Sequence, residues 1–105
     1  MSEGLDRLFA TIAARKGADP TQSYTAKLLA QGVETCAKKF GEEATETVIA
    51  AIQKDKTALA KESADVLYHL AVLWAASGIT PEDVYAVLKS REAMSGLEEK
   101  ASRKG

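Results

Sequence analysis

The chain has 105 residues, of which 46% are hydrophobic and 6% aromatic, enough apolar surface for one folded domain. Its 14 basic and 15 acidic side chains give a formal net charge of -1, so no global field draws it to nucleic acid or an anionic membrane. Residues 1–4 lack the pattern of a secretory signal, and the most apolar stretch, 66–79, is too short to cross a bilayer. We expect one cytoplasmic domain over residues 1–105, with neither nucleic acid nor membrane as partner.

The single cysteine, Cys36, limits the redox and metal chemistry open to the chain. It has no second thiol for an internal disulfide and no thiolate partners for a metal site. Free cysteine is among the most buried residue types. We therefore expect Cys36 to be a small apolar side chain of the core.

The first half of the chain carries three helical patterns. Apolar residues at helical spacing predict a first helix over about 3–15. Asp19-Pro20 then indicates a turn. Ser23 is expected to cap a short second helix over 24–30, because its hydroxyl can accept from an unpaired backbone N–H. A long third helix over about 32–53 follows.

The polar connector after residue 53 precedes a fourth helix. Asp55 or Thr57 is expected to cap its start. The helix is expected to end at about Ser77, because Gly78 is the residue best able to adopt the left-handed conformation past a helix end.

A last helix is predicted to begin at Thr80-Pro81-Glu82-Asp83, which combines a hydroxyl cap, a proline in the first turn and acids near the positive end of the helix dipole. Val84, Val87 and Leu88 are expected to form its buried stripe. A polar tail, expected to be flexible, follows from about residue 95. With no strand-like alternation in between, the sequence predicts an all-α antiparallel bundle of four to five helices.

Two pairs of acids are spaced so that each pair shares one helix face: Glu43 with Glu46, and Glu62 with Asp65. Carboxylates so placed repel each other, and a single such pair is usually surface decoration. Four carboxylates that face each other from two adjacent helices would form an oxygen-rich cluster suited to Mg²⁺.

The surroundings of the second pair favour a metal site. Glu62 and Asp65 lie beside apolar positions of their helix, so these acids need a cation or must stay protonated. The rival interpretation is pairing with lysines, because Lys38 and Lys39 precede the first acidic group and Lys61 adjoins the second.

His69 lies four residues after Asp65 and on the same helix face. It could orient Asp65 or take part in proton transfer. A structural histidine held by a hydrogen bond is the commoner arrangement, and the sequence leaves these roles open.

Several stretches resemble a known family. "EEATE" at 42–46 and "ESAD" at 62–65 are similar to the EExxE…ExxD pattern of the MazG-like all-α nucleoside triphosphate pyrophosphatases. The longer stretches that carry the resemblance are "SYTAKLL" at 23–29, "KKFGEEATETVIAA" at 38–51, "ESADVLYHLAVLW" at 62–74 and "SGLEEKASR" at 95–103. Together they resemble, over almost the whole chain, the phosphoribosyl-ATP pyrophosphohydrolases of histidine biosynthesis. Phe40, where an aliphatic residue is expected, is a small departure.

The resemblance implies a helical homodimer that hydrolyses phosphoribosyl-ATP to phosphoribosyl-AMP and pyrophosphate with Mg²⁺, the second step of histidine biosynthesis. Some relatives carry a fused cyclohydrolase domain, and we expect this chain to be the stand-alone form.

The same resemblance assigns roles to the acidic residues. The four that match the family's Mg²⁺ ligands are Glu43, Glu46, Glu62 and Asp65. Glu42 matches the first acid of the pattern, for which we expect an outer-shell or water-orienting role. Either Glu46 or Glu42 could take the proton of the attacking water, and the sequence does not decide between them.

Substrate contacts are expected at both ends of the chain. Lys39, and after it Lys38, are candidates for contacting substrate phosphate, although each could be an ordinary solvated lysine. Tyr24 could stack near the substrate or simply pack. The tail, which resembles that of the family, is expected to fold over a ribose phosphate through Ser95, Gly96, Lys100 and Arg103.

Two other functions remain open at this point. A house-cleaning nucleoside triphosphate pyrophosphatase would use the same metal chemistry, although it would not need a second phosphoribosyl site. A non-catalytic helical dimerisation module would carry the acids as surface or salt-bridge residues.

Overall fold

A computed structural model of the chain describes residues 3–92. Within this range the five elements are all α-helices: α1 Glu3–Ala14, α2 Tyr24–Gln31, α3 Val33–Ile52, α4 Lys56–Ser77 and α5 Pro81–Glu92. The predicted all-α class is confirmed, and the helix bounds agree with the expected ones to within one or two residues. None of the helices in 3–92 is long and apolar enough to cross a lipid bilayer. The cytoplasmic location stays a prediction.

Helices α2 and α3 are separated by a single glycine. The Ser23 hydroxyl accepts a hydrogen bond from the Ala26 backbone N–H at 3.1 Å, so the predicted cap is confirmed. Gly32 lies between the two helices with φ at 94°, in a region that side-chain-bearing residues rarely adopt. The chain therefore turns sharply at Gly32, and the short α2 packs across α3 and α4 instead of extending α3.

The ends of α4 are fixed by local chemistry. Of the two candidate caps, Asp55 is the one used: its carboxylate accepts from the Ala58 backbone N–H at 3.0 Å. At the other end Gly78 adopts the left-handed conformation, with φ at 79°, and its N–H bonds back to the last turn. Both expected ends are confirmed.

Helix α5 begins with a reciprocal cap. The Thr80 hydroxyl accepts from the Asp83 backbone N–H at 3.4 Å, and the Asp83 carboxylate accepts from the Thr80 backbone N–H at 2.8 Å. Pro81 occupies the first helical position, where a missing N–H costs nothing, and it is buried.

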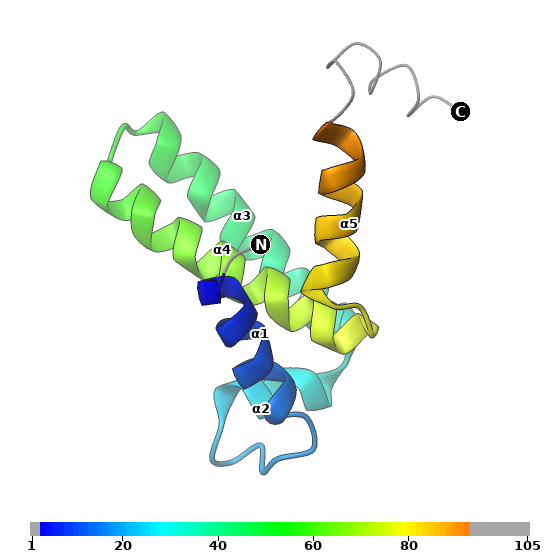
Figure 1. The fold of residues 1–105 in the computed structure, drawn as a ribbon. Coiled ribbons are helices and arrows are strands. Elements are labelled where there is room, and N and C mark those ends of the chain that lie inside the picture. Colours follow the sequence, from blue (N-terminus) through cyan, green and yellow to red (C-terminus); the bar gives the residue numbers. More distant parts are fainter. Residues whose placement is uncertain (1–2, 93–105) are drawn as a thin grey trace.

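The longest helices, α3 and α4, form an antiparallel hairpin that has the most extensive packing in the fold. Figure 1 shows α1 and α2 covering the end of this hairpin where α3 begins and α4 ends. The core lies at that end and is formed by Ile12, Leu28, Cys36, Ala71, Val72 and Ala75. Toward the α3–α4 connection the described core is thin, because Ala50 is the only fully buried residue there. The predicted acidic positions lie between these two parts of the hairpin.

The prediction that Val84, Val87 and Leu88 form a buried stripe on α5 is wrong for the described chain. Val87 is 48% and Leu88 46% exposed, and Val84 is half-buried. Helix α5 stands away from the α3–α4 hairpin (Figure 1) and contacts α1, where the Tyr85 hydroxyl donates to an Asp6 carboxylate oxygen at 3.0 Å. The stripe therefore exists in the sequence, but no other described element covers it.

Cys36 is confirmed as a core residue. Its side chain is fully buried among residues of α1, α2 and α4, and its thiol donates to the Leu28 carbonyl oxygen at 3.3 Å. Burial raises the pKa of the Cys36 thiol above its ordinary value, because the thiolate would be poorly solvated.

We therefore expect Cys36 to be inert in the folded protein. A chromogenic disulfide reagent at pH 8 should label it roughly a hundredfold more slowly than in guanidinium chloride, because the reaction must wait for local opening of the core. Fast, stoichiometric labelling under native conditions would contradict the packing described for α2, α3 and α4.

Candidate active site

Three of the four predicted ligands come together across the α3–α4 hairpin. Glu43 of α3 and Glu62 and Asp65 of α4 each offer one carboxylate oxygen, and these oxygens lie within 4.8 Å of one another. All three side chains are half-buried. We refer to Glu43, Glu62 and Asp65 as the carboxylate cluster. The spacing of Glu62 and Asp65 puts both on the face of α4 that meets α3.

The oxygens of the carboxylate cluster are not neutralised by the protein. Glu43 Oε2 and Glu62 Oε2 are enclosed and have no hydrogen-bond partner among the described residues. Enclosing a carboxylate oxygen without a donor costs several kcal/mol when the group is charged. Three hard oxygen ligands at this separation fit a divalent cation. The cluster is therefore suited to holding a metal ion.

Glu46, the fourth predicted ligand, lies next to the carboxylate cluster and is not one of its three members. It is exposed, and it lines an open groove of about 290 Å³ that also touches Glu62. The other residues of this groove are Ile49, Ala50, Gln53 and Ala58. The role of Glu46 as a metal ligand stays a prediction.

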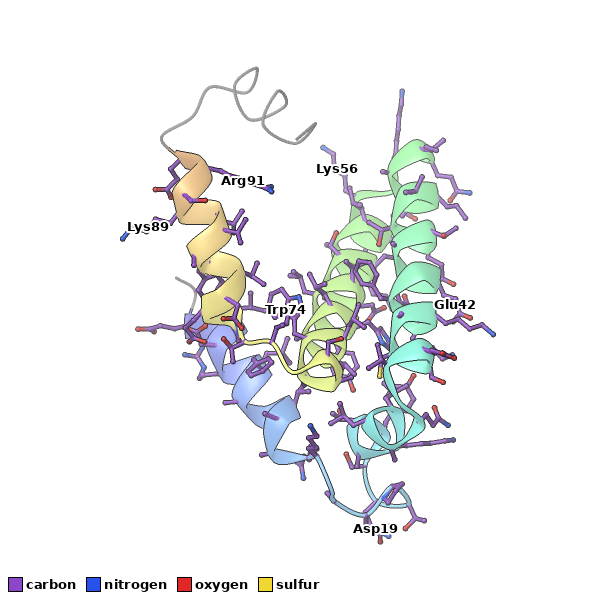
Figure 2. The ribbon with its side chains drawn as sticks, turned by 90° about the vertical axis from the view of Figure 1, so that its right-hand side faces the viewer. Asp19, Glu42, Lys56, Trp74, Lys89 and Arg91 are labelled. Atoms are coloured by element: carbon purple, nitrogen blue, oxygen red, sulfur yellow. The ribbon has the colours of Figure 1, made fainter. Side chains whose placement is uncertain are left out.

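The lysine interpretation of the acids is tested by the position of Lys39. Its ammonium group lies 3.4 Å from a carboxylate oxygen of Glu42, and both side chains are close to half exposed. Among the described residues no lysine or arginine forms an ion pair with the carboxylate cluster. Figure 2 shows Glu42 on the side of α3 turned away from α4. Lysine pairing therefore involves Glu42 and leaves the cluster unneutralised.

The remaining substrate-contact candidates are a second lysine, a tyrosine of α2 and residues of the tail. Lys38 is exposed. Tyr24, at the start of α2, is 54% exposed and presents its ring edge-on to His69, with the ring centres 6.5 Å apart. The tail candidates Ser95, Gly96, Lys100 and Arg103 lie outside the described residues, so their predicted contacts stay predictions.

His69 continues the row of functional side chains on α4, one turn beyond Asp65. It is 6% exposed, and Nδ1 is enclosed with no hydrogen-bond partner among the described residues. The hydrogen bond expected for a structural histidine is thus missing at Nδ1. Burial lowers the pKa of His69 most strongly; Asp65 and Glu42 oppose this, and Lys39 adds to it.

The enclosure of His69 is the feature of the site that the sequence did not predict. Tyr68 packs its ring edge against His69 at 5.0 Å, and the Tyr68 and Thr25 hydroxyls share a hydrogen bond between α4 and α2. Tyr24 completes the enclosure from α2. Tyr68 and His69 are neighbours on α4, but only the way α2 crosses α4 brings Tyr24 and Thr25 to them, and no local sequence signal encodes that crossing.

The fold and the site together define a class of protein. It is an all-α chain in which two antiparallel helices hold a carboxylate cluster suited to a divalent metal ion, with an open groove beside it.

Comparison with known proteins narrows this class to one family. Residues 5–92 match the phosphoribosyl-ATP pyrophosphohydrolase family, and the chain belongs to it. The chain is 65% identical over 99 residues to phosphoribosyl-ATP pyrophosphatase of Parvibaculum lavamentivorans, covering 94% of this chain and 91% of the relative. The corresponding protein of Paracoccus denitrificans is 60% identical over 96% and 94% of the two chains. That of Azospirillum brasilense is 59% identical over 95% and 90%.

We expect metal binding to depend on the carboxylate cluster. Adding Mg²⁺ or Mn²⁺ should raise the melting temperature of the wild-type protein, because an ion that binds only the folded state stabilises it. Glu62→Gln and Asp65→Asn should abolish this rise. Without metal each variant should be at least as stable as wild type, because a carboxylate charge that has no partner in the cluster is removed.

Glu42→Gln is the matched control, since it removes a carboxylate of the same helix hairpin outside the cluster. It should keep the metal-dependent rise in melting temperature. An equal loss in all three variants would contradict a site confined to the cluster.

Proposed function

We propose that the protein hydrolyses phosphoribosyl-ATP to phosphoribosyl-AMP and pyrophosphate with Mg²⁺, as the second step of histidine biosynthesis. The observation that carries the proposal is the carboxylate cluster, whose enclosed Glu43 and Glu62 oxygens lack a partner, in a chain of this family. The relatives reported above are named for this activity, and this chain aligns with them over nearly their whole length.

The carboxylate cluster supplies the first requirement of the reaction. Glu43, Glu62 and Asp65 would hold Mg²⁺ between α3 and α4. When bound, the ion offsets negative charge on the phosphate oxygens and on the leaving pyrophosphate. The half-buried position of the three side chains strengthens their attraction for the ion, because water screens it less there than at an exposed site.

The general base is the second requirement. Water attacks the α-phosphorus, the bond to the bridging oxygen of the β-phosphate breaks, and a carboxylate takes the proton of the water. Glu42 is engaged in an ion pair with Lys39. Glu46 is exposed, lies on the groove beside Glu62 and has no described ion-pair partner. We therefore assign the base to Glu46 and a supporting role to Glu42.

Phosphate contacts would come from the basic residues near the cluster. The first candidate is Lys39, which lies one turn before Glu43 on α3 and acts electrostatically on His69, and its ammonium group would meet a bound phosphate. Lys38 and Tyr24 are exposed and could join it from α3 and α2. The tail residues Ser95, Gly96, Lys100 and Arg103 are proposed to hold the phosphate of the second ribose.

A homodimer is part of the proposal, because much apolar surface of the described chain is uncovered. The exposed large apolar side chains are Tyr24, Val33, Val48, Ile49, Ile52, Leu67, Ile79, Val87 and Leu88. Large apolar side chains exposed in this number are often covered by a partner in soluble proteins. The stripe of α5 and the exposed face of the hairpin would be covered by a second copy.

The activity is tested by mixing the purified protein with phosphoribosyl-ATP and Mg²⁺ and measuring pyrophosphate. We expect turnover with metal and none with excess chelator. Deoxynucleoside triphosphates should be hydrolysed far less efficiently. Comparable efficiency with them would replace the proposed function with a house-cleaning pyrophosphatase, and release from neither substrate would leave a non-catalytic helical module.

The assignment of the base is tested by Glu46→Gln. The substitution should lower kcat by about a hundredfold or more, which is the usual contribution of a general base. It should leave the metal-dependent rise in melting temperature in place, because Glu46 is outside the carboxylate cluster. Loss of that rise would show that Glu46 is a ligand, and an unchanged kcat would move the base to another group.

The dimer is tested by sedimentation. Wild-type protein should sediment with the mass of two chains, and Leu88→Asp should shift it toward one, because a charge cannot be buried cheaply in an apolar interface. Ser90→Asp adds the same charge to another side of α5 and is the control. A wild-type monomer at micromolar concentration would contradict the proposed dimer.

A further inference from the structure

His69 is the only buried polar side chain among residues 3–92. It lies on the same face of α4 as Asp65, one helical turn further on. The charged groups that act on its ring are Asp65 on α4 and Lys39 and Glu42 on α3. His69 therefore lies at one end of the carboxylate cluster, the end next to Lys39 and Tyr24.

The ring of His69 is held without the use of its nitrogens. Tyr24 and Tyr68 pack against it edge-on, at interplanar angles of 89° and 79°. Such packing fixes the plane of the ring through its carbon atoms. Since Nδ1 is enclosed and has no described partner, a group that approaches from outside must meet the other nitrogen, Nε2. Burial lowers the pKa of His69 and so favours the uncharged ring, which carries one N–H donor.

A purely structural role does not explain this histidine. A buried polar atom without a hydrogen bond destabilises a fold, and a leucine at the same place would carry no such penalty. Proteins keep groups that lower stability chiefly where binding or catalysis needs them. The ring therefore has a use outside the packing of α2 against α4.

The layout of the site shows which part of the substrate would reach the ring. Along the hairpin, Glu46 and its groove lie on one side of the carboxylate cluster, and Lys39 and His69 lie on the other. In phosphoryl transfer the attacking and leaving oxygens are roughly in line on opposite sides of the phosphorus. If water is activated at Glu46, the leaving group departs toward Lys39 and His69.

We propose that His69 binds the leaving pyrophosphate, donating a hydrogen bond from Nε2 to a phosphate oxygen beside Lys39. The proposal rests on the proposed function and on Glu46 as the base. It assigns the two sides of the cluster: the water enters at the groove, and pyrophosphate leaves past the aromatic enclosure. A hydrogen bond to an anionic oxygen at this point also orients the polyphosphate before the bond breaks.

The test compares three substitutions by calorimetric binding of Mg²⁺-pyrophosphate and by thermal unfolding. His69→Leu should weaken pyrophosphate binding roughly tenfold, as expected for one lost charge-assisted hydrogen bond, with an unchanged or higher melting temperature. His69→Gln reaches the position of Nε2 with an amide N–H and should recover most of the affinity. His69→Asn reaches only the position of Nδ1 and should bind as weakly as His69→Leu.

Val72→Ala is the matched control, because it alters a buried side chain of α4 away from the cluster. It should lower the melting temperature and leave pyrophosphate affinity unchanged. If His69→Leu instead lowers the melting temperature or fails to fold, and His69→Asn binds pyrophosphate like wild type, the histidine is structural and the proposal is wrong. Equal affinity of His69→Leu and wild type also overturns it.

Failure of this proposal differs from failure of the proposed function. If wild-type protein releases pyrophosphate from phosphoribosyl-ATP while His69→Leu keeps full pyrophosphate affinity, only the role of His69 is lost. If wild-type protein neither hydrolyses phosphoribosyl-ATP nor binds Mg²⁺-pyrophosphate, both are lost.

Discussion

The site is built around three carboxylates whose oxygens α3 and α4 bring within 4.8 Å of one another. Like charges at this separation repel each other. Packing of the hairpin forces this approach, because the core at one end of the two helices fixes how they lie along their length. No described base offsets this repulsion, and we propose that a bound cation does. Under that proposal, metal binding would restore stability that the carboxylate cluster costs the fold.

The charged residues around the carboxylate cluster are arranged asymmetrically. Lys39 does not neutralise the cluster, because its ammonium group is engaged by Glu42. The Lys39–Glu42 ion pair therefore lies on one side of the cluster, and Glu46, which has no described ion-pair partner, lies on the other. A reaction that brings in water and releases pyrophosphate needs such an asymmetry, because a base must meet the water and positive or donor groups must meet the leaving phosphates.

The helix ends, and the shared helix face of Glu62 and Asp65, could be predicted from the sequence because residues close together in the chain determine them. Ser23, Asp55 and Gly78 fix helix ends through hydrogen bonds and backbone conformation within a few residues, and such signals are readable in one chain. The spacing of Glu62 and Asp65 likewise puts both on one helix face. Longer-range features were not predictable. The exposed stripe at Val87 and Leu88 depends on where α5 docks, and the enclosure of His69 depends on the crossing of α2 over α4.

Anomalous diffraction from crystals grown with Mn²⁺ would show directly whether the carboxylate cluster holds a divalent ion. We expect an anomalous peak between the carboxylates of Glu43, Glu62 and Asp65, at ordinary metal–oxygen distances from all three. Mn²⁺ bound elsewhere, with these three side chains turned apart into solvent, would contradict this expectation.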